Sequence, residues 1–251
     1  NDTTLVNLKS HAMRKQTGFA DRELLADKGH DIASFSADIP GRGNVPAGIV
    51  TYKENPEGRA QITVAFHGSE SREDFIEANV RAFKKQNPKI GITGYMHGGF
   101  SDRYDQSRDA LFAIVEDKLA AHGKSADDVE FQVTGHSLGG ALATIGAADI
   151  KTNLAQKAKV DLVTFSSPRV FDPQGAQEME NLLGDNRMVR IWREGDLVPA
   201  LSLGARILNY VPVLNNFVGF KHVGLPIQLE SVSAMPLKNH LFGTIREDAT
   251  S

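Results

Sequence analysis

The segment Val133–Leu142, which reads VTGHSLGGAL, constrains this chain more than any other. It places Ser137 in a Gly-x-Ser-x-Gly pattern between a short apolar run and an alanine-rich run of helical composition. A serine on a sharp strand-to-helix turn has a crowded backbone, and glycines two residues before and after it remove Cβ atoms that would clash with the neighbouring strand and helix. A chance match in a glycine-bearing loop is the competing interpretation, and the flanking runs count against it. The segment therefore predicts a nucleophile elbow with an exposed Ser137 hydroxyl.

Short β-type runs alternate along the chain with stretches of helical period, which indicates a parallel sheet. The runs are Ile62–Phe66, Glu130–Thr134, Val160–Phe165 and Met188–Trp192. A helix is expected from about Asp105 to His122, with a core-facing set at helical spacing: Ala110, Leu111, Ile114, Val115 and Leu119. Turns are expected at Pro40–Gly43 and at Asn55–Gly58, the second between two adjacent strands. We predict the α/β class, with a mostly parallel central sheet flanked by helices.

Composition narrows the classes of partner. The 251 residues carry a net charge of −3, and no basic run is longer than a pair such as Lys84–Lys85, so nucleic acid is not expected as a partner. The chain has no cysteine, which excludes disulfides and cysteine-ligated metals. Its apolar runs are far shorter than a membrane span, so no transmembrane segment is expected.

No linker interrupts the sequence, and one domain over residues 1–251 is the simpler interpretation. Because the chain does not begin with methionine, secretion is expected over a cytoplasmic location.

A serine hydroxyl is a poor nucleophile at neutral pH, so Ser137 requires a histidine base that is oriented by an acid. In hydrolases built on such an elbow, the order along the chain is serine, acid, histidine. Asp196 follows the run that ends at Trp192, on the loop that leaves the carboxyl end of a strand, which is where the acid belongs. Glu194 is the alternative. Three other aspartates lie at strand starts or turns, where solvated or capping roles are expected: Asp161, Asp172 and Asp185.

Two histidines follow Asp196, and only one of them can be the base. They are His222, in the segment GFKHVG, and His240, in the segment LKNHLFG. Each also has an ordinary structural interpretation, which is the usual role of a single histidine. Spacing along the chain does not decide between them.

From about Ile62 to Phe242 the sequence resembles the class 3 lipase family, typified by fungal triacylglycerol lipases. The resemblance rests on the joint order of six motifs: Val64–Ser69, Met96–Phe100, Val133–Gly140, Ser167–Val170, Gly195–Pro199 and Asn239–Leu241. It implies the α/β-hydrolase fold and serine-dependent hydrolysis of lipid carboxylic esters, with no metal and no organic cofactor. The expected partner is a lipid ester, with transient contact with a lipid interface.

The resemblance also assigns roles in the site. In the family the later Asp/Asn-His-Leu element supplies the base, so the role passes to His240 and His222 becomes the runner-up. The Leu138 amide is the expected first oxyanion donor, because the residue after the nucleophile opens a helix and its amide has no partner within that helix. By resemblance, the amide and hydroxyl of Ser69 supply the second.

Two further histidines lie close to these residues in the sequence. Family members more often carry arginine where this chain has His67, so His67 either orients the oxyanion loop or has a plain structural role. His136 precedes the nucleophile and is expected to hold the elbow by hydrogen bonding rather than to transfer protons.

Two segments are candidates for controlling access to the site. Residues 70–83 form an amphipathic stretch with a narrow apolar face, which the resemblance marks as a lid; a fixed surface helix is the alternative. Between Leu197 and Leu229 an apolar stretch with few charges separates the acid from the base. It includes Leu214, Phe217 and Phe220, and its members either wall an acyl-chain pocket or form ordinary core.

The expected reaction is hydrolysis of lipid esters through an acyl-enzyme, with triacylglycerol as the first substrate. A phospholipase A1 or a soluble carboxylesterase would use the same residues. A serine peptidase shares the chemistry but not the lipase-like motifs. The alternative outside the enzymes is a binding protein that has the same fold but catalyses no reaction.

Overall fold

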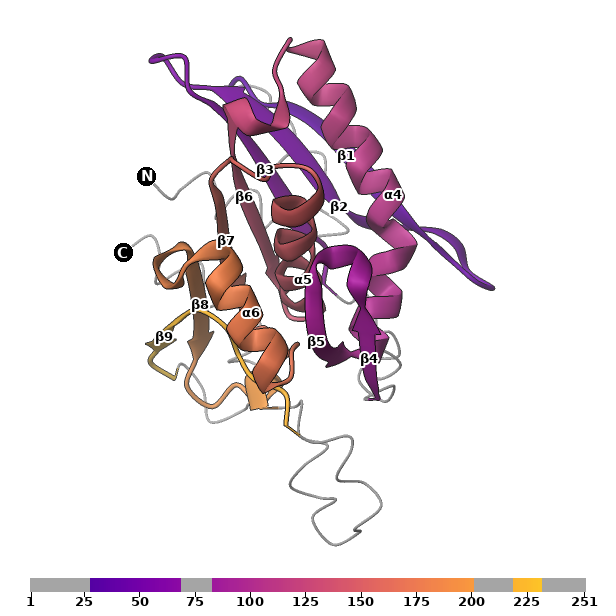
Figure 1. The fold of residues 1–251 in the computed structure, drawn as a ribbon, viewed down its shortest axis with the longest axis vertical. Helices are drawn as coiled ribbons and strands as arrows, with labels where there is room; N and C mark the ends of the chain where they lie inside the picture. Colours follow the sequence, from indigo (N-terminus) through magenta and orange to yellow (C-terminus); the bar gives the residue numbers. More distant parts are fainter. Residues whose placement is uncertain (1–27, 69–82, 201–218, 232–251) are drawn as a thin grey trace, which may run out of the picture.

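The computed structural model describes residues 28–68, 83–200 and 219–231. Its main element is a seven-stranded sheet with the order β1-β2-β3-β6-β7-β8-β9 (Figure 1). The strands from β3 to β9 pair in parallel, whereas β1, β2 and β3 pair antiparallel. Their bounds are Asp31–Ile39 (β1), Gly43–Glu54 (β2), Ala60–Phe66 (β3), Val129–His136 (β6), Val160–Phe165 (β7), Met188–Arg193 (β8) and Leu225–Leu229 (β9).

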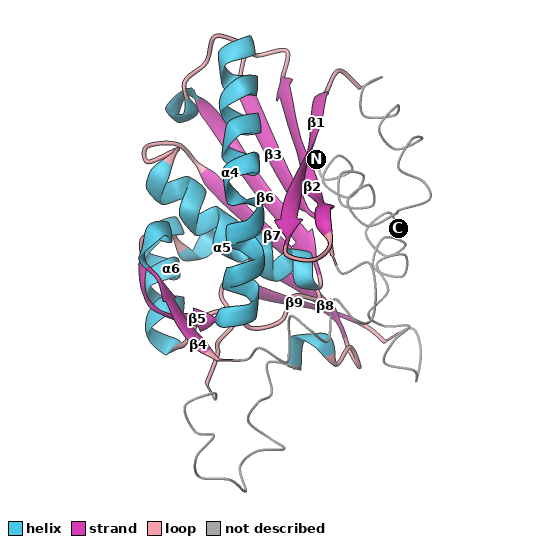
Figure 2. Cartoon of the chain, turned by 90° about the vertical axis from the view of Figure 1, so that its right-hand side faces the viewer, coloured by secondary structure: helices cyan, strands magenta, loops and turns pink. Residues whose placement is uncertain are grey.

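The three α-helices of the described ranges lie on the same side of this sheet (Figure 2). They are α4 (Gly98–Ala121), α5 (Leu138–Asn153) and α6 (Pro173–Leu183). A separate antiparallel pair, β4 (Lys84–Asn87) and β5 (Ile92–His97), lies beside α6. Short 3-10 helices complete the described elements: η1 (Pro88–Ile90), η2 (Ala126–Asp128), η3 (Asp185–Arg187) and η4 (Val198–Ala200).

Helix α5 packs against the middle of the sheet because its side chains are small. Every residue from Leu138 to Ile150 is buried. A Cβ atom added at Gly146 would lie 2.8 Å from the Cζ atom of Phe66 on β3, so the helix approaches the sheet more closely than an alanine would allow. This close approach holds the start of α5 at the carboxyl ends of β3 and β6.

The four predicted strand runs are confirmed as β3, β6, β7 and β8, and the predicted turns join β1 to β2 and β2 to β3. The sheet is mostly parallel, as expected. Helix α4 begins at Gly98, earlier than the periodicity predicted. Of its expected core residues, Leu111, Val115 and Leu119 are buried, while Ala110 and Ile114 are only half-buried.

A buried carboxylate joins α4 to α5. Asp149, on α5, is fully buried and accepts hydrogen bonds from Tyr104 Oη at 2.7 Å and Arg108 Nε at 2.6 Å, both on α4. Asn153 Nδ2 donates a further bond at 2.6 Å. Burial, and then the neighbouring Asp149 carboxylate, raise the pKa of the Tyr104 hydroxyl well above its ordinary value, so this hydroxyl stays a donor. A charge so placed is tolerated because its oxygens are satisfied by hydrogen bonds.

We expect Asp149→Ala to lower the free energy of unfolding by about 3 kcal/mol or more, because it leaves the Arg108 guanidinium and the Tyr104 hydroxyl without their acceptor. Urea unfolding followed by circular dichroism measures the change. Asp109→Ala is the matched control, since Asp109 is 95% exposed at its side chain and lies 3.5 Å from the same guanidinium. Similar losses in the two variants would contradict this account.

Candidate active site

Ser137 lies at the junction of β6 and α5 in a backbone conformation that is rare for a residue with a side chain. Its φ is 57° and its ψ is −126°. Its amide donates to Phe165 O at 2.9 Å, and its carbonyl accepts from the Gly140 amide at 2.9 Å. A positive φ costs on the order of 1–3 kcal/mol outside glycine and persists only where the surrounding structure enforces it. The predicted strand–turn–helix unit is therefore present, with the serine at the turn. The prediction that Ser137 is exposed was wrong, because the residue is buried, with 5% of its surface exposed.

The glycines around Ser137 are required for the reason predicted from the sequence. A Cβ atom on Gly135 would lie 2.1 Å from the carbonyl oxygen of Gly139 in α5. A Cβ atom on Gly139 would lie 2.5 Å from the carbonyl oxygen of Phe66 on β3. Backbone occupies both places, so neither contact can be relieved by moving a side chain.

The loop that follows β3 lies against the elbow. A Cβ atom placed on Gly68 would be 3.1 Å from His136 O and 4.0 Å from the Cβ atom of Ser137. His67 Nδ1 lies 2.6 Å from Gly68 O, so this nitrogen donates to the carbonyl and fixes the last described turn of the loop. That contact agrees with an orienting role for His67. Ser69 itself lies outside the described residues, so its place in an oxyanion site stays a prediction.

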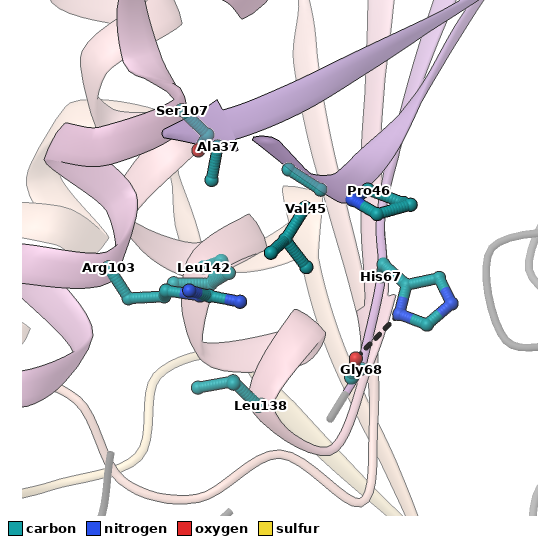
Figure 3. Close-up of a pocket in the computed structure, with 10 residues that line it drawn as sticks. Ala37, Val45, Pro46, His67, Gly68, Arg103, Ser107, Leu138 and Leu142 are labelled. Carbon is teal, nitrogen blue, oxygen red and sulfur yellow. Dashed lines mark hydrogen bonds between the residues drawn. The ribbon is translucent and has the colours of Figure 1, made fainter. Parts of the chain in front are cut away.

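Leu138 opens α5 directly after the serine. Its amide lies in the first turn of the helix, where an amide has no intrahelical acceptor. Leu138 and Gly68 also line the same pocket, together with residues of β2, α4 and α5 (Figure 3). The two segments expected to supply oxyanion donors are thus neighbours around the serine.

Arg103 is a residue of this pocket that the sequence analysis did not single out. Its side chain extends from α4 toward Leu138, and Ser107, one turn further along α4, lines the same pocket (Figure 3). The remaining wall is largely apolar and includes Val45 and Leu142. In the sequence, Arg103 and Ser107 follow the Met96–Phe100 motif at an i, i+4 spacing, which places them on one face of a helix. Only the packing of α4 shows which way that face points.

The structure distinguishes the two candidate acids. Asp196 is 7% exposed, whereas Glu194 is exposed to solvent. Asp196 Oδ1 accepts a hydrogen bond from the Val198 amide at 2.9 Å, which fixes the carboxylate on the loop after β8. Since β6, β7 and β8 run in parallel, this loop and the elbow leave the same edge of the sheet. Asp161 and Asp172, for which solvated or capping roles were expected, have other partners. Asp161 pairs with Arg187, and Asp172 caps α6 by accepting from the Gly175 amide.

His222 binds the loop that carries Asp196. Its Nε2 donates to Pro199 O at 2.9 Å, and no other hydrogen bond of His222 occurs in the described part of the chain. Burial lowers its pKa to about 3, with further lowering by Arg190 and Arg169. This nitrogen is occupied as a donor to a carbonyl, which suits a loop-holding histidine rather than a base. His240 lies outside the described residues, so the choice of base stays a prediction.

Most of the two candidate access segments, residues 70–82 and 201–218, lies outside the described residues. Of residues 70–83 only Phe83 is described, and its carbonyl accepts from the Gly98 amide at 2.8 Å. Of the apolar stretch between the acid and the base, Leu214 and Phe217 are not described. Phe220 is buried, with its ring centroid 5.4 Å from that of His97. The lid and the acyl-chain pocket therefore stay predictions.

Comparison with known proteins agrees with this geometry. The family model for lipase (class 3) matches residues 63–205, which is more than half of the chain. The chain belongs to the class 3 lipase family. The matched span contains the elbow, the loop after β3 and the loop with Asp196. The resemblance inferred from the six motifs is thereby confirmed.

Relatives in this family include enzymes of two kinds. A lipase of Caenorhabditis elegans is 29% identical over 182 residues, which are 72% of this chain and 48% of the relative. A chloroplastic phospholipase A(1) of Arabidopsis thaliana is 31% identical over 125 residues, which are 45% of this chain and 28% of the relative. A lipase of Rhizopus niveus is 32% identical over 123 residues, which are 48% of this chain and 30% of the relative. The chain spans about half or less of the length of these class 3 relatives.

Solved structures support the fold. The native Rhizomucor miehei lipase propeptide complex matches with a TM-score of 0.66 at 23% identity, over 90% of this chain and 67% of that chain. The α/β-hydrolase fold expected for a class 3 lipase is therefore confirmed. Within the described ranges, no helix has the length and apolar character needed to cross a membrane. The same residues contain no group of three His, Asp or Glu side chains placed to hold a metal ion.

We expect His222 to make the fold acid-sensitive. Its folded pKa of about 3 lies below its ordinary value of 6.5, so the unfolded chain takes up the proton first and stability falls as the pH drops below 6.5 toward 3. His222→Gln keeps a donor for Pro199 O but has no titrating group. Between pH 7 and pH 4.5 the wild type should therefore lose about 2 kcal/mol more unfolding free energy than this variant. Urea unfolding at the two pH values tests this.

His122→Gln is the control for this measurement. His122 contacts Asp31 of β1, and β1 and β9 are the two opposite edge strands of the sheet. A decline in His222→Gln as large as in the wild type would contradict the assignment.

Proposed function

We propose that this class 3 lipase hydrolyses carboxylic esters of lipids through an acyl-enzyme, with Ser137 as nucleophile, His240 as base and Asp196 as the orienting acid. The proposal depends most on one observation: Ser137 occupies a strained turn at which the helix start and the loop after β3 meet. No metal or organic cofactor takes part in this scheme.

The proposed reaction has two halves. In the first, the Ser137 hydroxyl attacks the ester carbonyl while its proton passes to His240; the tetrahedral oxyanion then collapses and the alcohol leaves with that proton. In the second, water attacks the acyl group on Ser137 with the same base, which releases the fatty acid and restores the serine. Asp196 holds His240 in the required tautomer and stabilises its charged form.

The oxyanion is proposed to rest on the Leu138 amide and on Ser69. Preorganised donors of this kind each contribute about 3–4 kcal/mol to the transition state in enzymes where they have been measured. The short separation between Gly68 and the elbow supports this pairing, because Ser69 is the next residue in the chain. One of the structural relatives, a triacylglycerol lipase that matches with a TM-score of 0.63, has a serine protease triad as its catalytic centre.

Ser137→Ala should abolish ester hydrolysis, with kcat reduced by about 10⁴-fold or more while the fold is kept. Initial rates on matched short-, medium- and long-acyl esters, including emulsified triacylglycerol and phosphatidylcholine, measure the effect. His240→Ala should match that loss, whereas His222→Ala should keep kcat within about tenfold of the wild type.

If His222→Ala abolishes hydrolysis and His240→Ala keeps it, the base is His222 instead. Unchanged hydrolysis in Ser137→Ala would overturn the proposed mechanism. If the wild type hydrolyses no ester at all, a peptide substrate then separates a serine peptidase from a binding protein without turnover.

Triacylglycerol is the proposed first substrate, and phospholipid is the second candidate. Two observations favour the second. Class 3 relatives from Arabidopsis thaliana and rice are phospholipases A1. The Arg103 side chain also extends into the pocket beside Leu138, where a cation is suited to a phosphodiester (Figure 3).

If phospholipid is the substrate, Arg103→Gln should lower kcat/KM for phosphatidylcholine by about tenfold or more and leave kcat/KM for triacylglycerol nearly unchanged. Arg103→Lys should recover part of the loss, since lysine keeps the charge without the planar fork. A loss of the same size on both substrates would assign Arg103 a structural role instead.

A further inference from the structure

The described part of the chain contains a second hollow, separate from the pocket lined by Leu138 and Arg103. It is bounded by α5, β7, β8 and the segment Lys221–Val223 that precedes β9. Its walls carry the basic residues Arg190 and Lys221 together with His222, but no carboxylate. The proposed ester hydrolysis uses none of these charges.

The Arg190 side chain lies on the face of the sheet that α5 covers, where an apolar residue is expected. It is paired directly with Thr164 of the neighbouring strand β7. Alternate residues of these strands, Phe165 and Ile191, pack together in a separate apolar cluster. Since strand side chains alternate between faces, Arg190 and Thr164 face α5, and Thr144 of α5 lines the same hollow. A cation therefore lies between the sheet and its covering helix.

Among the residues that the structure describes, Arg190 has no acidic partner. The Nε atom of Arg190 is buried and makes no hydrogen bond within the described structure. The guanidinium carbon lies 4.1 Å from the centroid of the Trp192 ring. Burial, and then the charge of Arg169, lower the pKa of Arg190 to about 10. A partly buried cation beside a second cation is costly unless an anion joins them.

Two further donors border the same space. The Lys221 side chain makes no hydrogen bond or ion pair in the described structure, and Lys221 lies at the exposed rim of the hollow. The hydroxyl of Thr164 also makes no hydrogen bond there. The residues that line the hollow thus carry a guanidinium on β8, an ammonium on the segment before β9 and a hydroxyl on β7.

We propose that this hollow binds a phosphate group, held by Arg190, Lys221 and Thr164. The guanidinium fork matches two phosphate oxygens, while the ammonium and hydroxyl approach from other elements, which suits a tetrahedral oxyanion. A carboxylate is planar and has two oxygens, so the fork alone would satisfy it. The phosphate is either inorganic phosphate or the headgroup of a phospholipid, and the chemistry of recognition is the same for both.

The position of the phosphate links this site to the acid loop. His222 lines the hollow and donates to Pro199 O, three residues after Asp196. In the proposed complex, the His222 side chain therefore lies between the bound anion and the segment that positions Asp196. The site depends only on binding and does not require that Ser137 be catalytic.

The single tryptophan of the chain supplies the measurement, because Trp192 lies under the Arg190 guanidinium. We expect inorganic phosphate, titrated into the whole chain at constant ionic strength against chloride, to change Trp192 fluorescence in a saturable way. Lys221→Gln leaves the Arg190–Trp192 contact in place and should weaken phosphate binding by at least tenfold. Arg59→Gln, which removes a surface arginine paired with Glu57, should leave it unchanged.

Arg190→Gln should abolish the saturable response. Because this variant also removes the cation over the tryptophan ring, its fold is checked by thermal unfolding, and Lys221→Gln remains the cleaner comparison. A second titration uses a soluble short-chain phosphatidic acid. A response to this lipid without one to inorganic phosphate assigns the site to a headgroup, and a response to both assigns it to phosphate in general.

Three outcomes would overturn the proposal: no saturable response to either ligand, a response that survives in Lys221→Gln and Arg190→Gln, or an equal response to acetate. Ester hydrolysis is not part of the readout, so failure here leaves the proposed role of Ser137 untouched.

Discussion

The positive φ of Ser137 is the constraint on which the rest of the described structure depends. It is maintained because three pieces of backbone meet with no Cβ atoms between them: the end of β3, the end of β6 and the first turn of α5. The burial of α5 supplies the force that holds them together, since apolar side chains removed from water offset the local strain. The strained serine is thus a product of the core and not of the loop in which it lies.

Much of this arrangement is readable from the sequence, because it depends on local patterns. Runs of β-branched and apolar residues identify β3, β6, β7 and β8, and the glycine spacing identifies the elbow. Position after a strand was enough to prefer Asp196 over Glu194, and burial supports that preference. No bounds were predicted for the antiparallel β1 and β2, although the turn at Asn55–Gly58 implied a strand before it, which is β2.

Other features could not be predicted because they depend on packing between distant segments. Nothing in the sequence around Arg103 or Arg190 says that these side chains turn toward hollows, since that depends on where α4 and α5 settle on the sheet. The contact between His222 and Pro199 joins residues far apart in the chain. The partners of buried charges likewise cannot be predicted without the structure. Asp149 is satisfied by α4, whereas the groups seen beside Arg190 among the described residues are an aromatic ring and another cation.

The burial of α5 also bears on how this chain can vary in evolution. A helix with no exposed position between Leu138 and Ile150 has little room for a longer side chain or for a charge beyond that of Asp149, whose partners on α4 satisfy it. Its glycines are confined by neighbouring backbone at Gly139 and by neighbouring side chains at Gly140 and Gly146. Sequence drift in this helix is therefore restricted to near-isosteric exchanges. Divergence in what the protein recognises must arise in the segments around the serine, while the helix that presents it stays almost fixed.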